Sequence, residues 1–181
     1  LGVANSTDAS GYYLFSGYQG STRPFQTSSD GSVSYVGDDG QRSLQVASSR
    51  QIPVSDSGRD IFANIRTGNG TFALGASSSN TGTGVIGSGS VVDPTAWSGH
   101  DYEVAFSSST DYTVTDTKTG TVIGSYTYSA GGSITAISGV TFSIQGTPAA
   151  GDTFSVAASR NQSIFSTLQN LIDAFSTDIE G

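Results

Sequence analysis

The chain lacks cysteine and methionine entirely and has one histidine and only seven basic residues among its 181. Without cysteine it has no disulfides and no thiolate metal ligands, although this does not fix its compartment. The shortage of positive charge argues against nucleic acid as a partner, because phosphates are bound by clustered Lys and Arg. Anionic membranes are disfavoured for the same reason, and no apolar run is long enough to span a bilayer. The acidic, Ser/Thr-rich composition, with a net charge of −8, favours an exposed extracellular protein.

The strongest pattern is the closing segment, 161–179. Its apolar residues recur at spacings of one, three and four, which is typical of one face of an α-helix. They are Ile164, Phe165, Leu168, Leu171, Ile172, Phe175 and Ile179. A helix of this length is marginal in water without a partner, and the chain offers no second helix of comparable quality. We therefore expect a piece of a longer protein, with the helix partner beyond the ends of this chain. Ser159 with Gln162 predicts the helix start.

The first third of the chain predicts β structure. The aromatic run 12–18, bounded by glycines, is typical of a strand. The segments 32–36 and 41–47 flank Gly37-Asp38-Asp39-Gly40, and this arrangement predicts a β-hairpin. One helical turn is expected within 55–65.

From Thr67 the chain becomes rich in Gly, Ser and Thr, and short alternating strands are separated by turn residues. Strands at this spacing predict an antiparallel β-sandwich or barrel-like domain. We therefore predict an α+β, mainly β protein of two domains. A β-rich insertion, 67–158, interrupts a mixed helix and β-hairpin domain built from 1–66 and 159–181.

No motif makes a strong case for catalysis, a cofactor or a metal. Gly82–Gly87 matches G-x-G-x-x-G, but no helix follows it, so we expect a loop and not a dinucleotide site. His100 lies in no nucleophile motif and is expected to be a surface histidine. One histidine and no cysteine make a metal site improbable. Asp152 follows Gly151 and is expected to cap a turn.

Two acidic pairs, Asp101 with Glu103 and Asp111 with Asp116, are candidates for glycoside hydrolysis. Isolated acids at strand edges are usually solvated, so we do not expect an enzyme. Four aromatic residues offer a possible sugar platform, with a place in the sheet core as the plainer interpretation. They are Trp97, Tyr102, Tyr126 and Tyr128.

Several stretches outside the insertion carry a family resemblance. They are Asn5-x-x-Asp8-x-x-Gly11-x-Tyr13-Leu14-Phe15-Ser16-Gly17-Tyr18 with Pro24-Phe25, the Gly37–Val46 segment, Asp56-Ser57-Gly58-x-Asp60-Ile61-Phe62, and Gly151-Asp152-x-Phe154 leading into Asn161-Gln162-Ser163-Ile164-Phe165. In order and spacing the chain resembles the FlgL family of flagellar hook-associated proteins, the hook–filament junction proteins. The insertion matches only loosely.

The resemblance implies a structural subunit of the bacterial flagellum that joins hook to filament. Its implied partners are further copies of itself in a ring, the neighbouring hook-associated junction protein, flagellin and a flagellar export chaperone. It implies export through the flagellar type III system to the cell exterior. The family's terminal helices form a coiled-coil core, and this chain lacks both, so Leu1–Ala4 and 161–179 would be helix stubs and the fragment a monomer. The assembly residues we predict are Ile164, Phe165, Leu168, Leu171, Ile172, Phe175, Tyr13 and Phe15.

Two other functions stay open at this point. An extracellular adhesin or carbohydrate-binding module would use exposed aromatic residues of the β insertion. A hydrolase would need the carboxylates of Asp101 and Glu103 to converge in a cleft.

Overall fold

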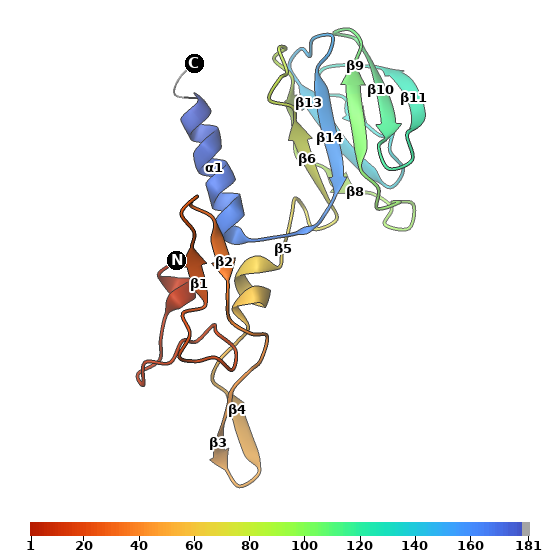
Figure 1. The fold of residues 1–181 in the computed structure, drawn as a ribbon. Coiled ribbons are helices and arrows are strands. Elements are labelled where there is room, and N and C mark those ends of the chain that lie inside the picture. Colours follow the sequence, from red (N-terminus) through yellow and green to blue (C-terminus); the bar gives the residue numbers. More distant parts are fainter. Residues whose placement is uncertain (179–181) are drawn as a thin grey trace. The chain divides into compact units, whose positions relative to one another are not determined.

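The computed structural model describes residues 1–178, apart from the side chains of Ala174, Thr177 and Asp178. The chain forms two compact units (Figure 1). Unit 1 combines Leu1–Ile65 with the chain from Asn161 on, and unit 2 is Arg66–Arg160. Ile179, the last residue of the predicted apolar face, lies outside the described residues. In the described part, no helix is both long and apolar enough to cross a membrane.

The elements at the two ends of the chain are short, except for one helix. They are η1 (Val3–Asn5), β1 (Phe25–Thr27), β2 (Val33–Tyr35), β3 (Ser43–Ala47), β4 (Arg50–Pro53), η2 (Arg59–Ala63), β5 (Ile65–Arg66), β15 (Asn161–Gln162) and α1 (Ile164–Asp178). The closing segment is a helix, as its period predicted. Its start is not held by Ser159, whose hydroxyl donates to the Thr67 carbonyl. The Ser163 hydroxyl accepts the Phe165 N–H instead, at 3.2 Å.

The predicted hairpin about Gly37–Gly40 is wrong. β2 pairs antiparallel with β1, and β3 pairs antiparallel with β4, so the two predicted arms belong to different hairpins. The Asp38 carboxylate explains the difference, because it accepts the N–H groups of Tyr18 and Gly40, both at 2.8 Å. These bonds hold the loop against the 16–18 segment and keep it from forming a tight turn.

The predicted aromatic strand at 12–18 is also wrong, since this stretch forms turns and two isolated bridges. Gly11 and Gly17 have φ values of 82° and 67°, which interrupt an extended run. The Asp8 carboxylate accepts the N–H groups of Ser10 and Tyr12 and so fixes a turn before the aromatic residues. The expected helix end at Leu1–Ala4 is a single 3₁₀ turn over Val3–Asn5, and the turn expected within 55–65 is the π-helical turn η2.

Unit 2 consists of two antiparallel sheets without closure into a barrel. Its strands are β6 (Phe72–Ala76), β7 (Val85–Ile86), β8 (Ser90–Val91), β9 (Tyr102–Phe106), β10 (Asp111–Asp116), β11 (Thr121–Thr127), β12 (Ser133–Ile134), β13 (Val140–Gln145) and β14 (Thr153–Ala158). One sheet has the order β11-β10-β9-β14-β6. The other has the order β12-β13-β7, with β8 also paired to β13. This is the mainly β, antiparallel architecture that the sequence predicts.

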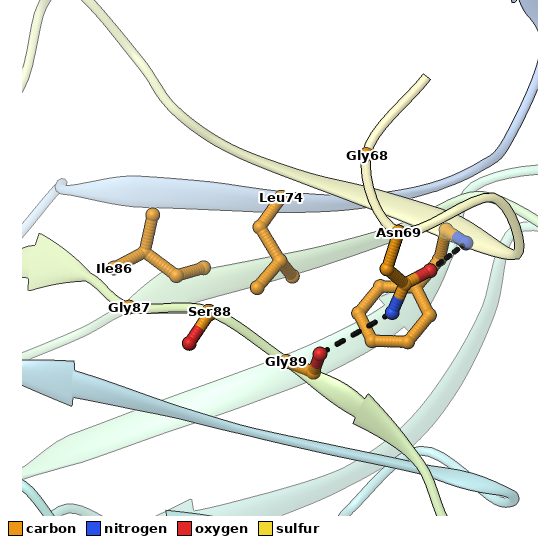
Figure 2. A pocket seen from close by; sticks show the side chains of 8 residues that line it. Gly68, Asn69, Leu74, Ile86, Gly87, Ser88 and Gly89 are labelled. Atoms are coloured by element: carbon orange, nitrogen blue, oxygen red, sulfur yellow. Dashed lines mark hydrogen bonds between the residues drawn. The ribbon is translucent and has the colours of Figure 1, made fainter. Parts of the chain in front are cut away.

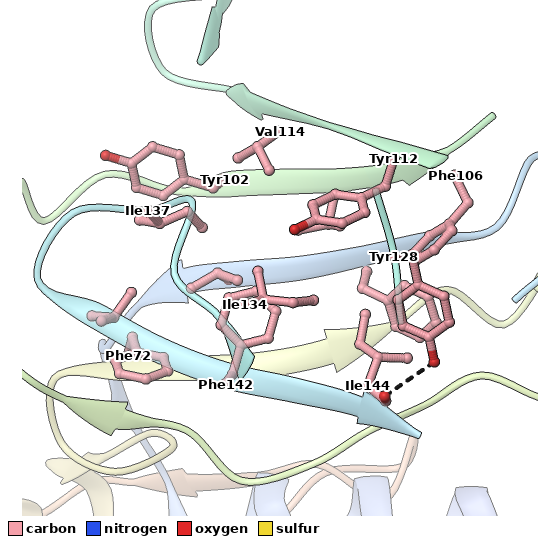
Figure 3. Close-up of a cluster of buried hydrophobic side chains, with 14 residues drawn as sticks. Phe72, Tyr102, Phe106, Tyr112, Val114, Tyr128, Ile134, Ile137, Phe142 and Ile144 are labelled. Carbon is pink, nitrogen blue, oxygen red and sulfur yellow. Dashed lines mark hydrogen bonds between the residues drawn. The ribbon is translucent and has the colours of Figure 1, made fainter. Parts of the chain in front are cut away.

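The core of unit 2 lies between these strands (Figure 3). Alternate residues of β9 and β10 point into it, as half-buried strands require. Val104 and Val114 are fully buried on neighbouring strands. The Tyr128 hydroxyl lies at one end of the cluster and donates to the Ile144 carbonyl at 3.1 Å, which satisfies the one polar atom that this ring brings inside.

Candidate functional site

An aromatic cluster in unit 1 anchors the start of α1. Phe25 of β1 lies at its centre, with 1% of its surface exposed. The Phe25 ring centroid is 5.2 Å from that of Phe165 in α1, 5.5 Å from Phe62 in η2 and 5.1 Å from Tyr35 in β2. Phe15 meets Phe62 edge-on at 5.1 Å. Aromatic pairs at these distances attract one another beyond simple burial, so the cluster holds the first turn of the helix against β1 and η2.

Along its length, α1 presents apolar side chains that the rest of residues 1–178 leaves partly or largely exposed. The exposed ones are Ile164, Leu168, Leu171, Ile172 and Phe175. Leu168 is 49% exposed and Phe175 is 63% exposed. The helix stands out from the rest of unit 1 along most of its length (Figure 1). A contiguous apolar face of this kind marks an interaction surface.

A groove of about 390 Å³ runs along part of this face. Leu168 and Ile172 line it from the helix, and Leu1 and Val33 line it from the rest of unit 1. Its walls are mainly apolar and hold no titratable side chain, so the groove is suited to packing and has no group for acid–base chemistry.

The two predicted assembly residues outside the helix lie in the framework of unit 1. The Tyr13 carbonyl accepts a bond from the Arg42 guanidinium at 3.0 Å, and its N–H donates to the Gly20 carbonyl at 2.8 Å. The Phe15 carbonyl accepts the Gly58 N–H at 3.0 Å. Both side chains are half-buried in unit 1.

His100 is not a simple surface histidine. Its Nδ1 lies 2.7 Å from Asp116 Oδ2 in unit 2, and Nδ1 is the donor when the carboxylate is ionised. The other oxygen of Asp116 accepts the N–H groups of Lys118 and Thr119 in the turn after β10. The bond from His100, with these two, holds the pKa of Asp116 below its usual value. Sequence reasoning missed this pair, because its members are 16 residues apart and belong to no motif.

Asp101 and Glu103 both line a pocket of about 290 Å³ in unit 2, but the Asp101 carboxylate is not free to act in it. Asp101 forms an ion pair with Arg160 and accepts the Ala158 N–H at 2.8 Å, so both of its oxygens are engaged. The Asp111 carboxylate accepts the hydroxyls of Ser108 and Thr110, which lower its pKa. Among residues 1–178, no group of three His, Asp or Glu side chains is placed to hold a metal ion.

The G-x-G-x-x-G segment, Gly82–Gly87, begins as a loop held by a buried aspartate and continues into β7, and no helix directly follows it. The Asp152 carboxylate, 1% exposed, accepts the N–H groups of Ala149 at 2.9 Å, Thr81 at 2.8 Å and Gly82 at 3.1 Å. These bonds hold the pKa of Asp152 below its usual value. A Cβ at position 82 would lie 2.4 Å from the Ala149 nitrogen, so only glycine fits there. Asp152 caps its turn as expected, and it also fixes the start of the motif as a structural loop.

A second pocket, of about 420 Å³, opens in unit 2 (Figure 2). Leu74 and Ile86 form its apolar wall, and the Gly87–Gly89 backbone forms its rim. Asn69 is fully engaged there: its amide nitrogen donates to the Gly89 carbonyl at 3.2 Å, and its oxygen accepts the Phe72 N–H at 2.9 Å. The pocket contains no titratable side chain and therefore no candidate for chemistry.

The four aromatic residues considered as a sugar platform belong to the interior of unit 2. Tyr102 and Tyr128 are buried in the core, and Trp97 packs between Phe72 and Tyr102 at 5.8 Å from each. Tyr126, partly buried, packs against the same core. No flat exposed platform is left for a carbohydrate, so the adhesin alternative has no support from these residues.

Comparisons with known proteins identify the family of the chain. Residues 76–158 match the family model of the D2-like domain of flagellar hook-associated protein 1. Crystal structures of FlgL from Xanthomonas campestris match 94% of this chain at 38% identity, with a TM-score of 0.85. The flagellar junction protein FlgL from Legionella pneumophila matches 94% of the chain at 32% identity, with a TM-score of 0.81. No curated protein matches the chain.

The chain therefore belongs to the flagellar hook-associated proteins, a family of structural proteins. Within that family its likeness is to FlgL, over nearly all of its length. The chain spans about 55% of the length of these FlgL chains.

Proposed function

We propose that this chain is the central part of a structural subunit that joins the flagellar hook to the filament and is needed for filament assembly and motility. The observation that carries the proposal is the 38% identity to FlgL across 94% of the chain. The candidate site supports the proposal. Its main surface is the apolar face of α1, and the two pockets lined by Leu74 and by Leu168 contain no titratable side chain. A role without catalysis follows, and no cofactor is required.

The two units take different roles in this proposal. The domain built from 1–66 and 159–181 is the inner, D1-like domain, and 67–158 is the outer, D2-like domain. Ile164, Leu168, Leu171, Ile172 and Phe175 pack α1 into a helical bundle with parts of the full-length protein outside these 181 residues, and Phe165 anchors the first turn of α1 to unit 1. Exposure of the apolar face supports this role, and so does the greater length of the FlgL relatives. Tyr13 and Phe15 brace the inner domain.

The proposed partners are further copies of the same protein in a ring, the neighbouring hook-associated junction protein and flagellin. The full-length protein is exported unfolded through the flagellar type III system, with a flagellar export chaperone, and acts outside the cell. The absence of cysteine is compatible with passage through an export channel, because no disulfide has to be broken. The 181-residue chain alone is a monomer in this proposal, since the bundle partner of α1 is not part of it.

Deletion and complementation test the proposal. Cells of the source organism without the full-length gene are expected to carry hooks without filaments, to release flagellin into the medium and to be non-motile. The intact gene is expected to restore filaments. Normal filaments in the deletion strain would overturn the junction role.

A further inference from the structure

The β3–β4 hairpin of unit 1 has an apolar face that no described part of the chain covers. Leu44 lies directly opposite Ile52 in the ladder, so their side chains share one face. Val54 continues that face, because it lies two residues after Ile52 and its N–H bonds the Arg42 carbonyl at 2.8 Å. Leu44 is 59% exposed, and the other two are about 40% exposed. Gln45 and Gln51 pair on the opposite, polar face.

The base of the hairpin is fixed, whereas its outer part has no support. The Arg42 N–H donates to the Ser55 hydroxyl at 2.8 Å, and its guanidinium bonds the Tyr13 carbonyl and lies over the Tyr12 ring. Beyond this base the two strands extend away from the remainder of unit 1 (Figure 1). A lone two-stranded hairpin is marginally stable in water and needs a third element against its apolar face. The β3–β4 hairpin, which we call the arm, is therefore fixed at its base, and no described part of the chain covers its apolar face.

The charge on the arm indicates what covers it. Residues 41–54 contain two arginines and no acid, while the whole chain has a net charge of −8, so the remainder carries −10. Arg42 is engaged at the base. Arg50, at the outer end, forms no ion pair among residues 1–178 and is exposed. An apolar strip that ends in a free cation is complementary to an acidic surface with an apolar centre, and the remainder of this same chain is acidic.

We propose that the β3–β4 hairpin is an intersubunit arm that docks its Leu44–Ile52–Val54 face on a second copy of this chain, with Arg50 directed at acidic residues of that copy. This inference rests on the proposed junction function and adds a specific contact to it. The arm and the surface that it meets are different parts of the chain, so we propose that the contact repeats head-to-tail. Repeated around a closed rotation, such a contact produces a ring.

Site-directed photo-cross-linking in assembled flagella tests the arm. The chain has no cysteine, so Ile52→Cys in the full-length protein introduces a thiol that is unique within this region, and a benzophenone maleimide is attached there. Gln51→Cys, the neighbouring residue on the polar face, is the matched control. We expect the Ile52 variant to form a conjugate of two copies, several-fold more abundant than that from the Gln51 variant. Arg50→Glu is expected to reduce the yield at Ile52 several-fold, and Arg50→Lys to retain it.

The alternative outcomes separate this inference from the function on which it rests. Equal yields at the two positions, a conjugate with a different flagellar protein, or no conjugate from protein located at the junction would overturn the arm and leave the junction role standing. Absence of the protein from flagella would overturn both. The melting temperature of each variant of the 181-residue chain serves as a folding control and is expected to match that of the parent chain, since the substituted residues are exposed.

Discussion

The rings of Phe25 and Phe165 lie 5.2 Å apart, and this contact joins the first turn of α1 to β1. The two residues are far apart in the chain, on opposite sides of unit 2 in sequence. Their contact therefore joins the two chain segments of unit 1, which fold together as one unit. The apolar face of α1 beyond Phe165 is thereby presented from a fixed base.

Phe25→Ala is expected to destabilise unit 1 by about 3–5 kcal/mol, because it empties the centre of the aromatic cluster. Urea unfolding followed by circular dichroism measures the change. Phe175→Ala on the same helix is the control: its side chain is 63% exposed, so we expect a change within about 0.5 kcal/mol. Equal effects of the two substitutions would show that the cluster does not hold the unit together.

Leu168→Asp separates folding from assembly. Because Leu168 is already half exposed, we expect the free energy of unfolding of the 181-residue chain to change by no more than about 0.5 kcal/mol. In the full-length protein the same change places a charge in the proposed bundle and is expected to abolish filament formation, as a motility assay measures. Asn170→Asp, at a polar position of the same helix outside its apolar face, is expected to support motility. Normal filaments with Leu168→Asp would rule out this face as an assembly surface.

Asp152 makes unit 2 sensitive to acid. Its folded pKa is lowered by backbone N–H groups, so its stabilising contribution is complete above the unfolded pKa of about 3.9 and is lost as the pH falls through the folded pKa. Asp152→Asn is expected to lower the melting temperature at pH 7, because both carboxylate oxygens accept N–H groups and the amide nitrogen of asparagine cannot accept any. It is also expected to flatten the fall in melting temperature between about pH 5 and pH 2. If the melting temperature of the variant fell with pH as steeply as that of the parent chain, carboxylates other than Asp152 would be responsible for the acid sensitivity.

His100→Ala removes the donor to Asp116. The pKa of Asp116 is then expected to rise toward its ordinary value, since the bond from His100 is the largest cause of its lowering. Carboxyl carbon NMR shifts across an acid titration measure this pKa directly. The bonds from Lys118 and Thr119 persist, so part of the lowering is expected to remain. A pKa that does not move would show that the His100–Asp116 bond is not formed in solution.

Sequence periodicity correctly predicted those helices and strands whose apolar residues follow a regular spacing along the chain. The apolar period of α1 indicates a helix from residues close together in the chain, and the alternation in β9 and β10 indicates half-buried strands. The main candidate surface followed from the same period, because an apolar face without a partner in the chain has to be exposed or covered from outside.

Contacts between distant residues explain what the sequence did not reveal. Gly37–Gly40 has the composition of a hairpin turn, but Asp38 bonds the Tyr18 N–H, 20 residues away, and β2 pairs with β1 instead. The acceptor role of Asp152 toward Thr81 and the bond between His100 and Asp116 are likewise formed only in the folded chain. Periodicity and turn composition report on neighbours in sequence, so they carry no signal for such pairs.

We propose that this chain belongs to a protein located between hook and filament. Immunogold electron microscopy of intact flagella, with an antibody raised against unit 2, tests this location directly. We expect gold confined to the short segment where the hook meets the filament. Gold distributed along the filament, or flagella without label, would contradict it.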